Sequence, residues 1–388
     1  MVREMIPAVQ HATGMTFHRQ PVVALRSRDQ LGAYLEAKAR SEFPPAEVQA
    51  QSRAYKLLRL VPDTMDLMKT QIDLLRQQVL GFYDPDSSAL FVIRGGDPLA
   101  LKIVIAHELV HALQDQYTHL NAILKMRRQN DRQMAGQAVM EGQATVAGLI
   151  AINPSVSLDQ LSQVFEAAQQ KVGSSDMADV PGMAALTNAP RMLREDLVFP
   201  YYSGAQFIIG FDGRRANESD EPFGDRLPIS TEQILHASKY TAHETPAAVA
   251  IGPSPGDTLL YDDDFGEFDT RVALETWGVS LDDAAQAASG WNGDRYALFG
   301  SRTGPALVWA SAFDTEQDAA EFDRALRRGW DHAAQGRPNA AARKWQVDTL
   351  DIGGVKVVRL VDAPLAWAGW RRLPAVTVSQ RSTVNSRR

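Results

Sequence analysis

The five residues His107-Glu108-Leu109-Val110-His111 carry the clearest chemical signal in the sequence. Residues four apart on a helix project from the same face, so His107 and His111 are predicted to lie side by side. Two imidazoles in that arrangement can share one Zn²⁺ ion at about 2.0–2.1 Å. Glu108 is offset by one residue, which suits it to act as a general base on a water molecule beside the metal. The pattern predicts the site of a zinc-dependent hydrolase.

The residues around this motif favour a metal site over its main alternative, a solvated or capped pair of histidines on a helix face. Apolar side chains precede and follow the motif, at residues 103–105 and at Leu113, so the helix is expected to be buried on most sides. Buried imidazoles beside a carboxylate are costly unless they bind something. Because the chain contains no cysteine, any metal must be held by His, Asp or Glu.

A third metal ligand is expected on the next predicted helix, where Glu141 lies within an apolar stretch and is followed by glycine. The alternative for Glu141 is a buried ion pair with an arginine such as Arg132. Asp115, one turn beyond His111, is the rival ligand. We prefer Asp115 as the hydrogen-bond acceptor that orients a histidine.

A peptide-cleaving site also needs a donor directed at the oxyanion of the tetrahedral intermediate. The candidates are Tyr201, Tyr202 and His236. Tyrosines are also common in protein cores, and His236 follows a sequence typical of a helix start, so it could instead be a helix-terminal histidine with a structural partner. The sequence leaves these alternatives open.

Several longer stretches resemble a known group of proteins. His107, His111 and a glutamate on a following helix resemble the gluzincin pattern, the His₂Glu zinc site of thermolysin-like peptidases. The stretches GFYDPDSSALFV, AHELVHALQDQ, AVMEGQA, FPYYSGAQFI and PISTEQILHASKY look like a poorly characterised group of bacterial and archaeal zincin-like proteins, and GWNGDRYALF and FDTEQDAAEF look like its C-terminal part. The resemblance spans about residues 15–325. The sequence departs from thermolysin in its longer spacing to Glu141 and in Thr145, which stands where thermolysin has an aspartate.

The elements that must position these residues can be read from periodicity. Helices are expected over residues 98–117 and 132–152, a turn over 81–86 and a short strand over 88–93. In zincins an edge strand binds the substrate as an added antiparallel strand, and residues 90–93 are the candidate for it. The alternative for that segment is an ordinary core strand.

The C-terminal third shows a different pattern, with helices expected over residues 281–289 and 316–334 and strands over 295–301, 306–313, 344–352 and 355–361. We therefore expect an α+β protein with a mostly helical, zincin-like catalytic domain over residues 1–250 and a smaller α+β domain over 256–370. Residues 371–388 are polar and basic, and they are expected to form a flexible tail.

Net charge and hydropathy indicate which partners the protein can bind. The net charge of −7 disfavours nucleic acid as a partner, because nucleic-acid binding requires a basic face. No segment approaches the roughly 18 apolar residues of a membrane helix. The expected partner is a peptide or protein substrate, and the sequence sets no oligomeric state. Two alternatives are a catalytically silent zinc scaffold that binds a partner and an amidase or esterase acting on a small molecule. The first 20 residues contain no apolar region of the kind found in a signal peptide, so none is expected there. Because proteins of the resembling group often carry an export segment, we favour an extracytoplasmic location over a cytoplasmic one.

Overall fold

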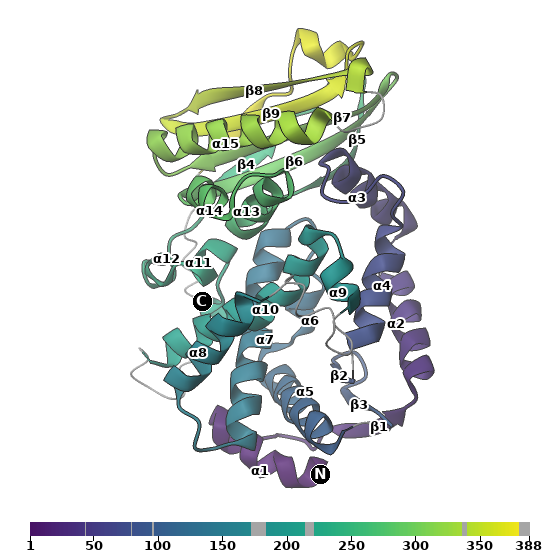
Figure 1. Cartoon of the computed structure of the whole chain (residues 1–388), viewed down its shortest axis with the longest axis vertical. Coiled ribbons are helices and arrows are strands. Elements are labelled where there is room, and N and C mark those ends of the chain that lie inside the picture. The colour runs from purple at the N-terminus through teal and green to yellow at the C-terminus, as the bar shows by residue number, and fades with distance from the viewer. Residues whose placement is uncertain are drawn as a thin grey trace, which may run out of the picture.

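The computed structural model describes residues 1–42, 44–78, 80–94, 97–171, 184–213, 221–335 and 340–379. The chain is a mostly helical α+β protein, as the sequence predicted, with a helical part built from its first two thirds and a larger sheet built from its last third (Figure 1). Among the described residues, no helix combines the length and the apolar character that crossing a membrane requires.

The described residues of the first part form twelve helices. They are α1 (Val2–Thr13), α2 (Arg28–Glu42), α3 (Pro45–Leu57), α4 (Leu67–Gln78), α5 (Pro98–Thr118), α6 (Asn121–Leu124), α7 (Asn130–Ile152), α8 (Leu158–Gln169), α9 (Ala184–Asn188), α10 (Arg191–Asp212), α11 (Thr231–Leu235) and α12 (Ala237–Thr241). Helices α5, α7 and α10 pack in sequence order at the centre of this part, where α7 contacts both of the others (Figure 1). These three helices carry most of the predicted site residues.

Helix α5 forms where its sequence signals predicted it. The side chain of Asp97 accepts a hydrogen bond of 2.8 Å from the backbone N–H of Ala100, and Pro98 occupies the first helical position, where no N–H is needed. The helix ends at His119, whose φ of 53° is left-handed. Its buried residues lie between Ile105 and Gln114, so the HExxH motif is in the part of the helix that contacts the rest of the protein.

Glycines allow the backbone of α7 to approach its neighbours closely. A Cβ on Gly142 would lie 2.3 Å from the carbonyl of Gly204, and one on Gly204 would lie 2.1 Å from the carbonyl oxygen of Ala138. On the other side, a Cβ on Gly148 would lie 3.3 Å from the backbone nitrogen of His107. Because Gly142 follows Glu141 directly, this packing brings α10 close to the predicted metal ligand.

A three-stranded sheet lies beside α5, with strand order β1-β3-β2 and with bounds β1 (Val22–Arg26), β2 (Gly81–Asp84) and β3 (Ala89–Ile93). Strand β3 is parallel to β1 and antiparallel to β2, so it has partners on both sides. The prediction that residues 90–93 form the edge strand was therefore wrong. The segment predicted as a turn, from residue 81, contains β2, which is one of the two edge strands.

The larger sheet has the order β5-β6-β7-β9-β8, with bounds β5 (Thr258–Asp263), β6 (Trp291–Ser301), β7 (Gly304–Phe313), β8 (Arg343–Ile352) and β9 (Val355–Pro364). Helices α13 (Gly266–Thr276), α14 (Leu281–Ala288) and α15 (Glu316–Gln335) cover the face toward the helical part (Figure 1). Successive side chains of β7 point to opposite faces of the sheet, so one face can pack on these helices. Leu307 and Trp309 belong to the core shared with the helices, while Ala306 and Val308 belong to the cluster on the opposite face.

The C-terminal segment departs from its prediction as a flexible tail. Strand β10 (Val376–Ser379) pairs in antiparallel fashion with β4 (Ala248–Ile251), and valines of both strands pack on the larger sheet. The apolar side chains Val376 and Val378 explain this pairing, so the chain is ordered through Ser379. Residues 380–388 of the predicted tail lie outside the described residues.

Candidate metal centre

Three side chains from two helices meet at one point between α5 and α7. His107 Nε2 lies 3.1 Å from Glu141 Oε2, His111 Nε2 lies 3.3 Å from the same oxygen, and the two Nε2 atoms are 3.0 Å apart. The side chains are 17%, 9% and 16% exposed, in the order His107, His111, Glu141. The structure therefore brings together the three residues that the sequence predicted as metal ligands.

The spacing of these three atoms fits a zinc ion. Ligands held at about 2.0–2.1 Å around a tetrahedral ion lie about 3.3 Å from one another. The three distances of 3.0–3.3 Å match one face of such a tetrahedron. Two imidazole nitrogens and one carboxylate oxygen are also a common donor set for zinc in which a fourth position stays open.

The charges around these atoms favour a cation. Burial lowers the pKa of His111, but the carboxylate of Glu141 outweighs that effect and raises the pKa to about 9. For Glu141, burial acts to raise the pKa, but the two histidines shift it well below its usual range. The carboxylate is thus ionised, and the His111 imidazole beside it is stabilised with a positive charge. A divalent metal ion would supply that charge at the same point.

Glu108 lies beside the metal ligands and is held by strand β2. Its side chain is buried, and its Oε2 accepts a hydrogen bond of 2.7 Å from the backbone N–H of Tyr83. Burial raises the pKa of Glu108, which suits a carboxylate that must accept a proton near neutral pH. The edge strand therefore fixes the candidate general base.

Asp115 does not orient either histidine, which corrects the sequence prediction. Its Oδ2 accepts a hydrogen bond of 2.9 Å from the hydroxyl of Tyr83, and its Oδ1 accepts one of 3.1 Å from the backbone of Leu120. The partner of His111 Nδ1 is instead Gln114 Oε1, at 2.9 Å. Asp115 stands four residues after His111 and shares its side of the helix, but its two carboxylate oxygens are engaged by Tyr83 and Leu120, which leaves Gln114, three residues after His111, to reach Nδ1.

Of the three predicted oxyanion donors, only Tyr201 lies at the metal ligands. Its ring stacks on that of His107 with centroids 6.0 Å apart, and its hydroxyl donates to the carboxylate of Glu141. The negative charge of Glu141 and burial together raise the pKa of Tyr201, so the hydroxyl keeps its proton. The side chain is 38% exposed, and a substrate could therefore reach the hydroxyl.

Tyr202 and His236 lie elsewhere, which corrects both predictions. Tyr202 packs against the ring of Phe165 on α8, because adjacent residues on a helix face different directions. His236 pairs with Glu267 Oε1 of α13 at 2.7 Å. The helix before His236 is bound to the start of α7 through Asp131, ten residues and about 15 Å along that helix from Glu141. His236 is thus a paired histidine near a helix end, the alternative that the sequence left open.

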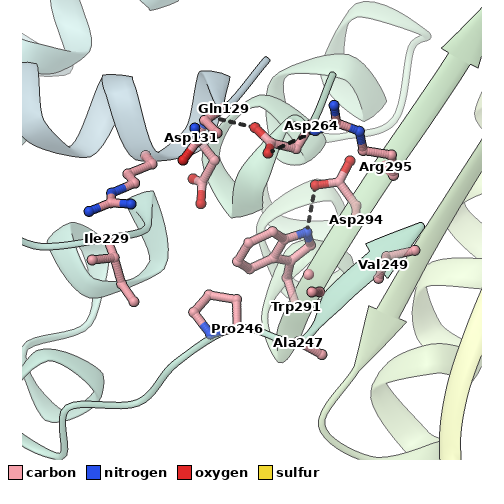
Figure 2. A pocket seen from close by; sticks show the side chains of 13 residues that line it. Gln129, Asp131, Ile229, Pro246, Ala247, Val249, Asp264, Trp291, Asp294 and Arg295 are labelled. Carbon is pink, nitrogen blue, oxygen red and sulfur yellow. Dashed lines mark hydrogen bonds and ion pairs between the residues drawn. The ribbon is translucent and has the colours of Figure 1, made fainter. Parts of the chain in front are cut away.

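A second group of buried acidic side chains has protein partners. In the pocket at the junction with the larger sheet, Asp264 accepts from the backbone N–H of Asp131 and Asp294 accepts from the indole of Trp291 (Figure 2). Burial raises the pKa of Asp294 to about 6. We interpret this pocket as part of the packing between the two halves of the chain.

A further cluster of three carboxylates surrounds Lys239. Its Nζ lies 3.1 Å from Glu232 Oε1 and also pairs with Glu244 and Asp314. Burial raises the pKa of Glu232 to about 8. The lysine ammonium already occupies the position that a metal ion would need, so this cluster is an ion-pair network.

Comparison with known proteins gives one match. A family model described as Domain of unknown function (DUF8575) matches residues 258–368. That segment contains all five strands of the larger sheet with α13, α14 and α15, and it contains none of the metal-centre residues. No curated protein and no solved structure matches the chain.

Sequence reasoning missed Tyr83, Gln114 and Gln143. Tyr83 lies in a segment whose Asp-Pro sequence is typical of a turn. It holds Glu108 through its backbone N–H, so the residue type at position 83 gives no sign of this contact. Gln114 could have been found, because it stands three residues after His111 on the same helix face. Gln143 contacts Gln114 from another helix, so only the packing of α5 against α7 identifies it.

Proposed function

We propose that this protein is a zinc-dependent hydrolase and most specifically a metallopeptidase. The observation that carries the proposal is the convergence of His107 Nε2, His111 Nε2 and Glu141 Oε2 within 3.0–3.3 Å of one another, with the buried carboxylate of Glu108 next to them on α5. His107, His111 and Glu141 would hold the ion. When bound, zinc supplies a Lewis acid that lowers the pKa of water and polarises a carbonyl group.

The side chains of the site supply the remaining steps. Glu108 removes a proton from the attacking water as the water adds to the substrate carbonyl, and it then passes that proton to the leaving nitrogen. The Tyr201 hydroxyl, directed into the site from α10, donates a hydrogen bond to the oxygen on which negative charge develops. Because Tyr201 keeps its proton at neutral pH, it can act as a donor throughout the reaction.

The position of β2 supports a peptide as the substrate. Among the described strands, β2 pairs only with β3, so its second edge has no strand partner. The N–H of Tyr83 points from that edge to Glu108, which shows that the edge faces the site. A peptide added along β2 would place its backbone beside the general base.

The main alternative is a zinc-binding scaffold that holds a partner and has no turnover. In that case the larger sheet and its helices, which contain none of the metal-centre residues, would hold the partner. The two functions differ in one measurement, made on purified full-length protein: zinc content together with cleavage of a broad peptide library. The peptidase proposal expects about one zinc per chain and cleavage that a chelator abolishes. Stoichiometric zinc without cleavage favours the scaffold.

A further inference from the structure

A chain of buried side-chain amides leads away from His111 on the side opposite the metal ligands. Gln114 Oε1 lies 2.9 Å from His111 Nδ1, and Gln114 Nε2 donates to Gln143 Oε1 at 2.9 Å. Gln143 Nε2 in turn donates to Glu221 Oε2 at 2.7 Å. Gln114 is fully buried and Gln143 is 5% exposed, so solvent does not compete for these groups.

Glu221, at the outer end of this series of amides, sets the direction of every hydrogen bond in the series. A carboxylate can only accept, so Gln143 must present its NH₂ group to Glu221 and its carbonyl oxygen to Gln114. Gln114 must then present its NH₂ group to Gln143. The backbone carbonyl of Met140 imposes the same orientation, because it also accepts from Gln114 Nε2, at 3.0 Å. Two independent acceptors, the Met140 carbonyl and Gln143 Oε1, therefore fix the orientation of the Gln114 amide.

This orientation requires that Nδ1 of His111 carries a proton, whether the imidazole is neutral or positively charged. Gln114 Oε1 can only accept, so His111 Nδ1 must be the donor. In a neutral imidazole the lone pair then lies on Nε2, the atom that points toward His107 and Glu141. The amide chain thus prepares His111 to bind a metal through the correct nitrogen before any metal arrives.

We propose that Gln114, with its polarity set by Gln143, Glu221 and the Met140 carbonyl, is the positioning residue for His111. The proposal rests on the proposed zinc site, and it assigns to a neutral amide the role that an acidic side chain has in many zinc proteins. It also explains why an amide fits here. A carboxylate at position 114 would face the oxygens of Met140 and Gln143 without a proton to share.

The test uses full-length protein carrying ¹⁵N-labelled histidine and free of metal. In the wild type we expect a slowly exchanging Nδ1–H signal from His111, identified by its loss in His111→Ala. Gln114→Leu should speed its exchange at least tenfold and raise the zinc dissociation constant roughly 10–100-fold in chelator competition. Gln116→Leu is the matched control on the same helix. Its amide contacts the backbone of Arg19, so it should leave both quantities unchanged.

A milder pair of variants covers the case in which Gln114→Leu fails to fold. Glu221→Ala removes the outer acceptor, and it should raise the zinc dissociation constant by less than Gln114→Leu does. Glu221→Gln keeps an acceptor oxygen, so it should stay near the wild type. The proposal is overturned if His111 lacks the Nδ1 proton, or if Glu221→Ala and Glu221→Gln bind zinc with equal affinity. A protein that keeps the protected Nδ1–H but binds no zinc overturns the proposed function instead.

Discussion

The backbone N–H of Tyr83 donates a 2.7 Å hydrogen bond to Glu108 Oε2, and this bond joins the edge strand β2 to the helix that carries both histidines. The same tyrosine donates its hydroxyl to Asp115 at 2.9 Å, about two turns further along the helix. Tyr83 therefore attaches β2 to α5 at two points. A peptide bound along β2 would be aligned by the same strand that holds the general base.

Glu108→Gln separates catalysis from binding. The glutamine oxygen can still accept from the Tyr83 N–H, so the variant should fold and bind zinc as the wild type does. An amide cannot accept a proton from water, and turnover should fall roughly 10²–10⁴-fold. The measurement is cleavage of a substrate found in the library digest, at equal zinc content. Equal cleavage rates for the two proteins would show that Glu108 is not the base.

His107→Ala should lose bound zinc, because it removes one of three ligands from a site with no other histidine donor among the described neighbours. His332→Ala is the matched control. His332 lies on α15, where its Nδ1 contacts the carbonyl of Trp277 at 3.0 Å, and its loss should cost about 1 kcal/mol of stability without changing zinc content. Metal analysis of both purified variants decides the matter. Full zinc occupancy in His107→Ala contradicts the site.

Much of the site was predictable because it depends on spacing within single helices. The i and i+4 positions place His107 beside His111, and the Asp-Pro sequence at residues 97–98 marks the start of α5. Glu141 was predictable as a lone acidic residue in an apolar stretch. The glycine after it gains its meaning only from the structure, where it lets α10 approach within contact of α7.

The errors arose where function depends on tertiary contacts. Periodicity identified β3 as a strand but could not show that β1 and β2 cover both of its edges. Tyr201 and Tyr202 are equivalent in sequence, and only the direction of each side chain from α10 separates a residue at the metal ligands from one packed on Phe165. The pairing of β10 with β4 joins segments more than a hundred residues apart, which local pattern cannot reveal.

Glu141→Gln and Asp115→Asn should differ sharply in zinc affinity. Glu141 Oε2 lies within 3.3 Å of both histidine nitrogens, so exchanging its charged oxygen for a neutral amide should weaken zinc binding strongly. Asp115 contacts Tyr83 and Leu120 instead, so Asp115→Asn should keep its zinc and lose only part of its activity through a less firmly held β2. Chelator competition on both variants measures the difference. Equal losses of affinity would contradict Glu141 as the third ligand.

Tyr201→Phe tests the proposed oxyanion donor, with Tyr202→Phe as its neighbour on the same helix. Loss of the Tyr201 hydroxyl should lower kcat roughly 10²–10³-fold with little change in KM, since that hydrogen bond strengthens only as charge develops. Tyr202 packs on Phe165, away from the metal ligands, so Tyr202→Phe should leave both constants unchanged. If both variants keep wild-type kcat at full zinc content, the oxyanion donor is a different group.

Stability should fall as the pH rises from about 4 to 7, and the carboxyl pair Asp196–Asp269 accounts for part of that fall. The two side chains, from α10 and α13, are hydrogen-bonded through a proton, and burial raises the pKa of Asp196 to about 7. A folded-state pKa above the unfolded value means that this contribution is fully present below about pH 4 and is lost as the pH rises through about 7.

Asp196→Asn should therefore flatten the pH dependence of unfolding. The asparagine NH₂ can donate to Asp269 at every pH, so the fold no longer needs the shared proton. Thermal or urea unfolding of the metal-free protein between pH 4 and 8 measures the slope. The exposed Asp282 of α14 provides the control, and Asp282→Asn should keep the wild-type slope. If Asp196→Asn loses as much stability as the wild type over this range, the pair does not share a proton and the fall in stability has its origin in other buried carboxyls, such as Asp294.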